Sequence, residues 1–309
     1  MTLAELDPAP WDPEAMAPRL AAQTGDLPTA ARGRHVAVAA DIPMTAFAGR
    51  QALRAGGTAA DALVAMAALD TVLARGTTSL AGELVAVFHE AATGDTHVLD
   101  AGFDTVLGDA ASYAPGRDGA TGRAVLVPGF LAGLEALWRR FGALRWADLW
   151  APARHFAREG FPLSPAFGRA LVRRQGVLLR TPEGRAIFAP AGALPAAGDV
   201  FRQPALARTL ERVAADGAAA LYPGDWAARA AAAVGGAGGR LGVADLARYE
   251  ARWVAPLTGT YLGHAVRVAP PLTMGGRRCR SRASATSSAA RSCSPPIVSG
   301  GATRTACPR

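Results

Sequence analysis

The stretch Gly49–Ala67, GRQALRAGGTAADALVAMA, contains the end of one helix, a double-glycine stop and the start of a second helix. Gly56-Gly57 is typical of a helix C-terminus. Thr58, which follows, is a favourable N-cap. We therefore predict a first helix over residues 45–55 and a second helix that begins directly after Thr58.

The second predicted helix runs from Ala59 to about Leu73. Its only charged residues are Asp61 and Asp70, and the rest are mostly alanine, leucine, valine and methionine. A helix that is apolar on nearly every side is typical of a protein core. We expect this helix to be buried almost all round.

Short apolar runs on both sides of these helices predict strands. His35–Ala40 (HVAVAA) is suited to a buried strand. Leu84–His89 and Thr96–Asp100 flank a turn that contains a glycine, which favours a hairpin. We expect the hairpin to belong to a central sheet.

From Val127-Pro128-Gly129 onward the pattern becomes helical, and Leu257–Val268 is again typical of β-structure. Early strands, a helical middle and a late strand indicate an α+β layered fold, not an alternating βα repeat. The predicted helices cover 130–141, 146–159, 165–179, 203–216, 226–234 and 243–249.

The charge of the chain lies mainly at its end. All 33 basic residues are arginine and the formal net charge is +8, which would favour a nucleic-acid partner if the charge were spread over the fold. Seven of these arginines and no acidic residue fall within 277–309, so residues 1–276 are nearly neutral. We therefore expect no nucleic-acid partner.

Composition divides the chain into three predicted regions. Residues 1–32 are a proline-rich lead-in, 33–276 form one domain, and 277–309 form a basic tail that we expect to be disordered, because it has no apolar periodicity. The lead-in has no apolar core of a signal peptide, and no run is long enough to span a membrane. We expect a cytoplasmic protein without a membrane partner.

Metal and cofactor chemistry has little support in the sequence. All three cysteines lie in the tail without metal-ligand spacing, and the five histidines are scattered. No GxSxG elbow and no phosphate-binding GK[ST] motif is present. We expect neither a metal nor a cofactor.

Several motifs, in the right order, resemble the γ-glutamyltranspeptidase (glutathione hydrolase) family over residues from about 33 to 276. The double-glycine helix pair at 49–67 is one. The run Ala157-Arg158-Glu159-Gly160-Phe161-Pro162, which follows Ala151-Pro152-Ala153, is another, and it is more specific. Further matches are Val127-Pro128-Gly129, Gln203 to Leu210, Leu221-Tyr222-Pro223-Gly224, Asp245 to Tyr249, Pro256-Leu257 and Pro270-Pro271 with Gly275-Gly276.

The resemblance implies the first, large-subunit half of an N-terminal nucleophile hydrolase, a four-layer αββα sandwich. Such a precursor cuts itself before a threonine, which then acts as nucleophile with its own amine as base. The implied reaction is γ-glutamyl transfer from glutathione, or hydrolysis of a γ-glutamyl or other small amide. A second-half, small-subunit chain is the implied partner.

The family's nucleophile has no match in this sequence. Thr303 has a glycine-containing context but lacks the threonine and histidine that should follow it. After Gly276 the resemblance to the family ends abruptly, and the sequence becomes rich in arginine, serine, cysteine and proline. We interpret this change as a shifted reading frame. No catalytic residue is assigned, and we expect the chain alone to be inactive. The alternative is a non-catalytic remnant or a protein that binds a small ligand or a partner.

The candidate substrate-binding residues are Gly102 and Phe103. In typical members an arginine after the hairpin binds the α-carboxylate of the glutamyl group, and here that slot falls on Gly102 or, with a slip of one residue, on Phe103. Arg117 and Arg123 are alternative cations for this task, although each is also typical of an exposed charge. Glu83 is either a site carboxylate or a solvated or structurally paired one. These departures favour action on another amide.

Overall fold

The computed structural model describes residues 5–9, 11, 16, 18–20, 30, 32–74, 76–107, 113–119 and 121–270. They belong to two compact units, Met1–Ala86 with Leu99–Val254, and Val87–Val98 with Ala255–Arg309. The predicted disordered tail, its three cysteines and Thr303 lie outside the described residues, as does most of the proline-rich lead-in.

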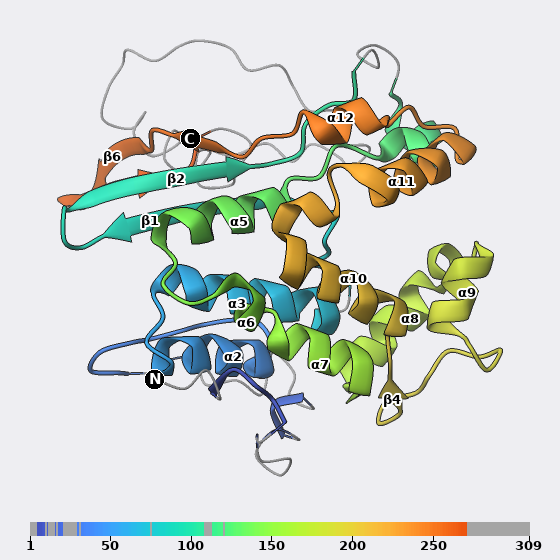
Figure 1. Cartoon of the computed structure of the whole chain (residues 1–309), viewed down its shortest axis with the longest axis horizontal. Coiled ribbons are helices and arrows are strands. Elements are labelled where there is room, and N and C mark those ends of the chain that lie inside the picture. The colour runs from blue at the N-terminus through green and yellow to red at the C-terminus, as the bar shows by residue number, and fades with distance from the viewer. Residues whose placement is uncertain are drawn as a thin grey trace, which may run out of the picture. The chain divides into compact units, whose positions relative to one another are not determined.

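The helix pair predicted from the double glycine is present. Helix α2 spans Pro43–Arg54 and α3 spans Ala59–Leu73 (Figure 1). Gly56, between them, has a φ of 86°, a conformation that glycine adopts without strain. Ten of the fifteen residues of α3 are buried, which confirms the prediction of a core helix.

A buried carboxylate fixes the start of α3. Thr58 and Asp61 form a reciprocal capping box. Asp61 also accepts the backbone N–H of Ala143 at 2.9 Å, just after the end of another helix. Because its oxygens are satisfied by these donors, Asp61 is fully buried at an acceptable energetic cost.

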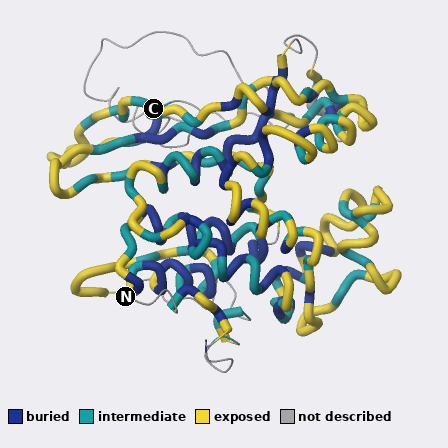
Figure 2. The backbone as a smooth tube through the Cα atoms, in the orientation of Figure 1, coloured by how far each residue is buried: buried dark blue, intermediate teal, exposed yellow. Residues whose placement is uncertain are grey.

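Helices α5 (Phe130–Phe141), α6 (Trp146–Leu149) and α7 (Ala151–Glu159) pack against α3, and α10 (Pro204–Asp216) packs against α7. Figure 2 shows buried residues gathered along α2 and α3. The Trp146 indole N–H donates to the Val213 carbonyl at 2.8 Å inside this core. The largest fully buried side chains are Trp150, Leu6, Met44, Leu69, Leu99, Leu131, Leu134, Leu137, Leu149, Leu210, Leu246 and Val64.

The predicted hairpin is confirmed, and three small sheets are described. Strands β1 (Leu84–Glu90), β2 (Asp95–Ala101) and β5 (Arg252–Val254) form one sheet in the order β1-β2-β5. Strands β3 (Phe161–Pro162) and β4 (Val200–Phe201) pair antiparallel. In the second unit, β6 (Leu257–Tyr261) and β7 (His264–Val268) form an antiparallel hairpin in which Leu257 lies opposite Val268.

The remaining helices complete the first unit. They are α4 (Pro115–Asp118), the 3-10 helix η3 (Gly122–Ala124), α8 (Pro165–Leu178), α9 (Pro182–Phe188), the 3-10 helix η4 (Gly217–Ala220), α11 (Gly224–Gly236) and α12 (Val243–Ala247). Within the described part of the chain, no helix is long and apolar enough to cross a membrane.

Two sequence-based predictions of local structure are wrong. Residues 35–40 form no strand, and Val36 is 49% exposed. A strand needs a neighbour for its backbone N–H and C=O groups, and no pairing of 35–40 occurs within the described residues. The helix predicted over 146–159 is two helices, because the chain bends at Trp150 and Pro152 occupies the first turn of α7.

Candidate functional site

The predicted substrate-binding residues lie in the loop that follows β2. We call residues 102–107 the slot loop. Gly102 comes directly after the buried last residue of β2, Ala101, and its N–H donates to Asp100 Oδ1 at 3.0 Å. Phe103 is 39% exposed. A rigid strand therefore presents both candidate residues at its end.

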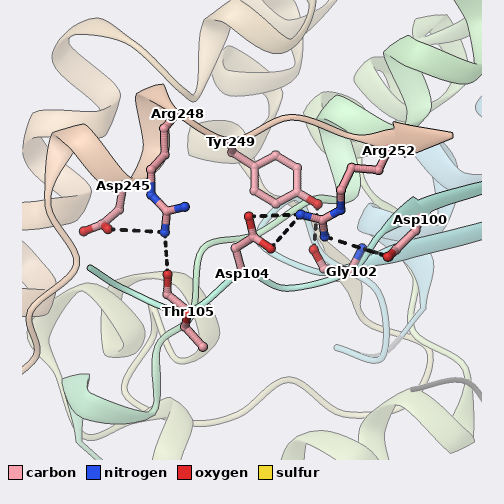
Figure 3. A network of polar contacts seen from close by, with 8 residues as sticks. All are labelled: Asp100, Gly102, Asp104, Thr105, Asp245, Arg248, Tyr249 and Arg252. Carbon is pink, nitrogen blue, oxygen red and sulfur yellow. Dashed lines mark hydrogen bonds and ion pairs between the residues drawn. The ribbon is translucent and has the colours of Figure 1, made fainter. Parts of the chain in front are cut away.

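A second segment, residues 245–252, fastens the slot loop and is called the strap here (Figure 3). At its start, Asp245 Oδ1 accepts the N–H of Leu107 at 2.7 Å. Next, Arg248 Nη2 donates to the Thr105 carbonyl at 2.6 Å. These contacts join parts of the chain about 140 residues apart in sequence, since the separations are 138 and 143.

The other half of the strap holds the beginning of the loop. The Tyr249 hydroxyl donates to the carbonyl oxygen of Gly102 at 2.6 Å. Arg252 Nη1 donates to both oxygens of Asp104, at 3.0 and 3.4 Å. The loop is thus anchored at four of its six residues.

The strap changes from a helix to a strand along its length, and this course explains the arrangement. Asp245 lies in α12, and the residues that contact the loop follow it at intervals of three, four and seven. Asp245 and Arg248 lie about one helical turn apart, since Arg248 is the C-cap of α12, whereas Tyr249 follows outside the helix. At the end of the strap the chain becomes β5, which lies beside β2 in the sheet and brings Arg252 next to the loop.

Arg252 is shared by two carboxylates. Besides its bonds to Asp104, Nη2 lies 3.8 Å from Asp100 Oδ2. The hydrogen bond to Asp104, supported by the charges of both carboxylates, raises the pKa of the Arg252 guanidinium. The arginine is therefore charged at every physiological pH, and it pairs with one carboxylate of β2 and one of the slot loop.

Tyr249 belongs to a stacked pair of buried tyrosines. Its ring lies 5.6 Å from that of Tyr222, with an angle of 13° between the planes. Burial, with smaller effects from Asp104 and other nearby charges, raises the pKa of Tyr249 to about 12. Burial also raises the pKa of Tyr222, whose hydroxyl donates to the Pro128 carbonyl at 2.8 Å. Both phenols stay protonated and act as hydrogen-bond donors.

The alternative cations suggested by the sequence are engaged elsewhere. Arg117 makes two hydrogen bonds to its neighbour Asp118, from Nε at 2.8 Å and Nη2 at 2.9 Å. Arg123 lies in η3, and its charge also helps to lower the pKa of Asp118. Arg248 and Arg252 are the cations that contact the slot loop, and sequence reasoning missed both because they lie about 150 residues away from Gly102.

The other residues considered from the sequence are Glu83 and the histidines. Glu83 is exposed, and a Cβ added at Gly102 would lie 3.8 Å from its Oε2, so this carboxylate is close to the slot loop. Burial lowers the pKa of His155, which favours a neutral ring. Among the described residues, no group of three or more histidine, cysteine, aspartate or glutamate side chains is placed to hold a metal ion.

Sequence comparison gives the same relationship as the motifs. The model of the family described as "Gamma-glutamyltranspeptidase" matches residues 45–278. Among curated relatives, the chain is 31% identical over 239 residues to the "Glutathione hydrolase-like YwrD proenzyme" of Bacillus subtilis, covering 74% of this chain and 44% of the relative. It is 29% identical over 246 residues to "Glutathione hydrolase 3" of Arabidopsis thaliana, covering 77% and 38%.

Solved structures agree with the fold. The Helicobacter pylori γ-glutamyltranspeptidase matches with a TM-score of 0.75 and 27% identity, over 80% of this chain and 73% of that one. A cephalosporin acylase from Bacillus halodurans matches with a TM-score of 0.65 and 27% identity, over 74% and 44%. The chain is therefore the large-subunit portion of an N-terminal nucleophile hydrolase fold, as the sequence predicted.

The match covers most of this chain but less than half of each curated relative. This chain spans less than half the length of the two curated relatives above. Because the family model covers most of the chain and the fold agrees with solved members, the chain belongs to the γ-glutamyltranspeptidase family.

Proposed function

We propose that the complete protein is an amidohydrolase or acyltransferase of the γ-glutamyltransferase type. The observation that carries this proposal is the family match over 45–278, together with the glutathione hydrolase relatives. A threonine hydroxyl attacks the amide carbonyl, the amine leaves with a proton, and the resulting ester is cleaved by water or by a second amine. The acyl group thus passes to water or to an acceptor.

The threonine belongs to a second half that is the partner of this chain. The chain spans 44% or less of the two curated relatives described above, so most of each relative has no counterpart here. The slot loop is this chain's contribution to the reaction: it lies at the end of a fixed strand and recognises the acyl group. Its four anchors supply the rigidity that a binding loop requires.

The test begins with the gene. The locus is resequenced across the codons for Gly275 to Arg280 and all downstream frames are translated. We expect one frame to encode a second half that begins at a threonine. The complete protein is then expressed and assayed with γ-glutamyl and arylacetyl p-nitroanilides.

The control is the same protein with its first second-half threonine changed to alanine, which should process poorly and release no nitroaniline. An active wild type and an inactive threonine variant support the proposal. If every downstream frame is closed, or if the intact protein releases no nitroaniline from either amide, the proposed function is wrong.

A further inference from the structure

Both backbone hydrogen-bonding groups of Gly102, in the slot loop, already have partners. Its N–H donates to Asp100 and its carbonyl accepts the hydroxyl of Tyr249. A ligand carboxylate needs hydrogen-bond donors, and free N–H groups at strand ends often supply them. Gly102 therefore has no backbone donor to offer a carboxylate.

The charges around Gly102 sum to a negative value. Four ionisable side chains lie close to it: Asp100, which accepts its N–H; Arg252, which pairs with Asp100 and with Asp104 two residues on; and Glu83, whose Oε2 would lie 3.8 Å from an added Cβ. Three of these four are carboxylates, and the one guanidinium is shared by two of them. At the other end of the strap, Arg248 and Asp245 lie 3.7 Å apart and balance each other. An incoming carboxylate would therefore meet repulsion that is not offset.

The exposed apolar group of this loop is Phe103. Phe103 is 39% exposed, although burial of its large apolar side chain would be favourable. Its position is fixed on both sides, because Gly102 is held by Tyr249 and Asp104 is held by Arg252. A fixed aromatic surface of this kind binds apolar groups at a low cost in conformational entropy.

We propose that Phe103 determines acyl specificity, and that the acyl group bound beside it is aromatic or aliphatic and carries no carboxylate at that end. This inference rests on the proposed function, since it names the substrate class of the same loop. The missing cation, the surplus of negative charge and the exposed ring all disfavour a free glutamyl α-carboxylate. They favour an arylacetyl or similar amide.

Two primary amides provide a matched pair of probes. Phenylacetamide carries an apolar acyl group, and L-glutamine carries the γ-glutamyl group with its carboxylate and amine. Binding of each to this chain is measured by saturation-transfer NMR titration. Burial of a phenyl ring predicts that phenylacetamide binds at least about tenfold more tightly than glutamine.

Three variants localise the effect. Phe103→Ala should abolish the preference for phenylacetamide. Phe103→Arg should weaken phenylacetamide and strengthen glutamine by about tenfold, because it adds a guanidinium that binds carboxylates. Ile187→Ala is the matched control, since Ile187 on α9 is also 39% exposed, and it should change neither affinity.

Each other outcome overturns the inference. Tighter binding of glutamine by the wild type would do so, and so would an unchanged preference in Phe103→Ala or the absence of binding of either amide. The proposed function is judged separately by threonine-dependent release of nitroaniline from the complete protein. Such release with the γ-glutamyl amide alone would uphold the function and reject the apolar acyl class.

Discussion

The hydroxyl of Tyr249 lies 2.6 Å from the carbonyl oxygen of Gly102, a residue 147 positions earlier in the chain. The same tyrosine passes close to Gly129, where an added Cβ would meet both its hydroxyl and the carbonyl of Ala101. Three segments therefore meet at one phenol: the end of β2, the start of α5 and the strap. The position of the slot loop depends on this meeting point.

Removing the Tyr249 hydroxyl should loosen the loop without opening a cavity. Tyr249→Phe leaves the Gly102 carbonyl without its donor, and we expect the free energy of unfolding to fall by about 1 kcal/mol. Urea denaturation followed by tryptophan fluorescence measures the change. Tyr113→Phe, at an exposed tyrosine, is the control and should alter stability by less than about 0.5 kcal/mol. Equal stability of the two variants would show that the bond contributes nothing.

Residue 129 must be glycine because the fold leaves no room for a Cβ atom there. In Gly129→Ala the new methyl group would overlap the hydroxyl of Tyr249 and the Ala101 carbonyl, and the residue has little freedom to move because its N–H donates to Gly82 O at 3.0 Å. We expect a loss of roughly 2–3 kcal/mol or more in the free energy of unfolding.

The matched control for this substitution is Gly176→Ala. Gly176 lies inside α8 and nothing stands within 4 Å of its added Cβ. Alanine is favoured over glycine in a helix, so this variant should be more stable by roughly 0.5–1 kcal/mol. The two substitutions should therefore have opposite signs in the same denaturation assay, and a stable Gly129→Ala would contradict the packing described here.

Local signals explain which elements could be predicted from the sequence. Thr58 and Asp61 are neighbours in sequence, so their capping box is encoded locally, and α3 begins and ends as predicted. Residues 35–40 have the composition of a strand, yet a strand also needs a partner, and composition carries no information about partners. Helix α9 was missed because its seven residues include none that is buried, so no apolar periodicity marks it.

The contacts of the candidate site could be predicted only in part, for the same reason. Gly102 and Phe103 follow a recognisable hairpin, so local sequence locates them. Arg252 comes near them because β5 lies beside β2, a pairing that no local pattern indicates. The resemblance predicts that the family's arginine is absent from this loop. It did not show that the nearby arginine would be occupied by Asp104 and Asp100.

Asp70 should make stability depend on pH. Burial raises the pKa of Asp70 above 3.8; the hydrogen bond from Thr45 lowers it, and the charge of Asp41 raises it by a smaller amount. An acid whose pKa is higher in the folded state binds its proton more tightly when folded. Its contribution to stability is therefore largest below 3.8 and is lost as the pH rises through the folded pKa.

Asp70→Asn tests this dependence. Asparagine keeps an oxygen that accepts the 2.8 Å hydrogen bond from Thr45 and never ionises. Relative to the wild type, the variant should gain stability as the pH is raised from acid to neutral, as measured by urea denaturation at a series of pH values. Glu183→Gln, at an exposed position of α9, should follow the wild-type curve. Parallel curves for Asp70→Asn and the wild type would rule out a raised pKa.

The turn between β6 and β7 contains the one non-glycine residue of the described chain with a positive φ. Leu262 has a φ of 49° and is 80% exposed, and Gly263 follows it with a φ of 80°. Two-residue hairpin turns with positive φ at both positions strongly prefer Asn-Gly. Leucine has no side-chain group that relieves this conformation, so Leu262→Asn should stabilise the hairpin by about 1 kcal/mol.

Amide hydrogen exchange at Gly259 and Val266, which face each other across the strands, measures the change. Slower exchange at both amides is the expected result, whereas faster exchange would mean that the leucine side chain stabilises the turn through contacts of its own.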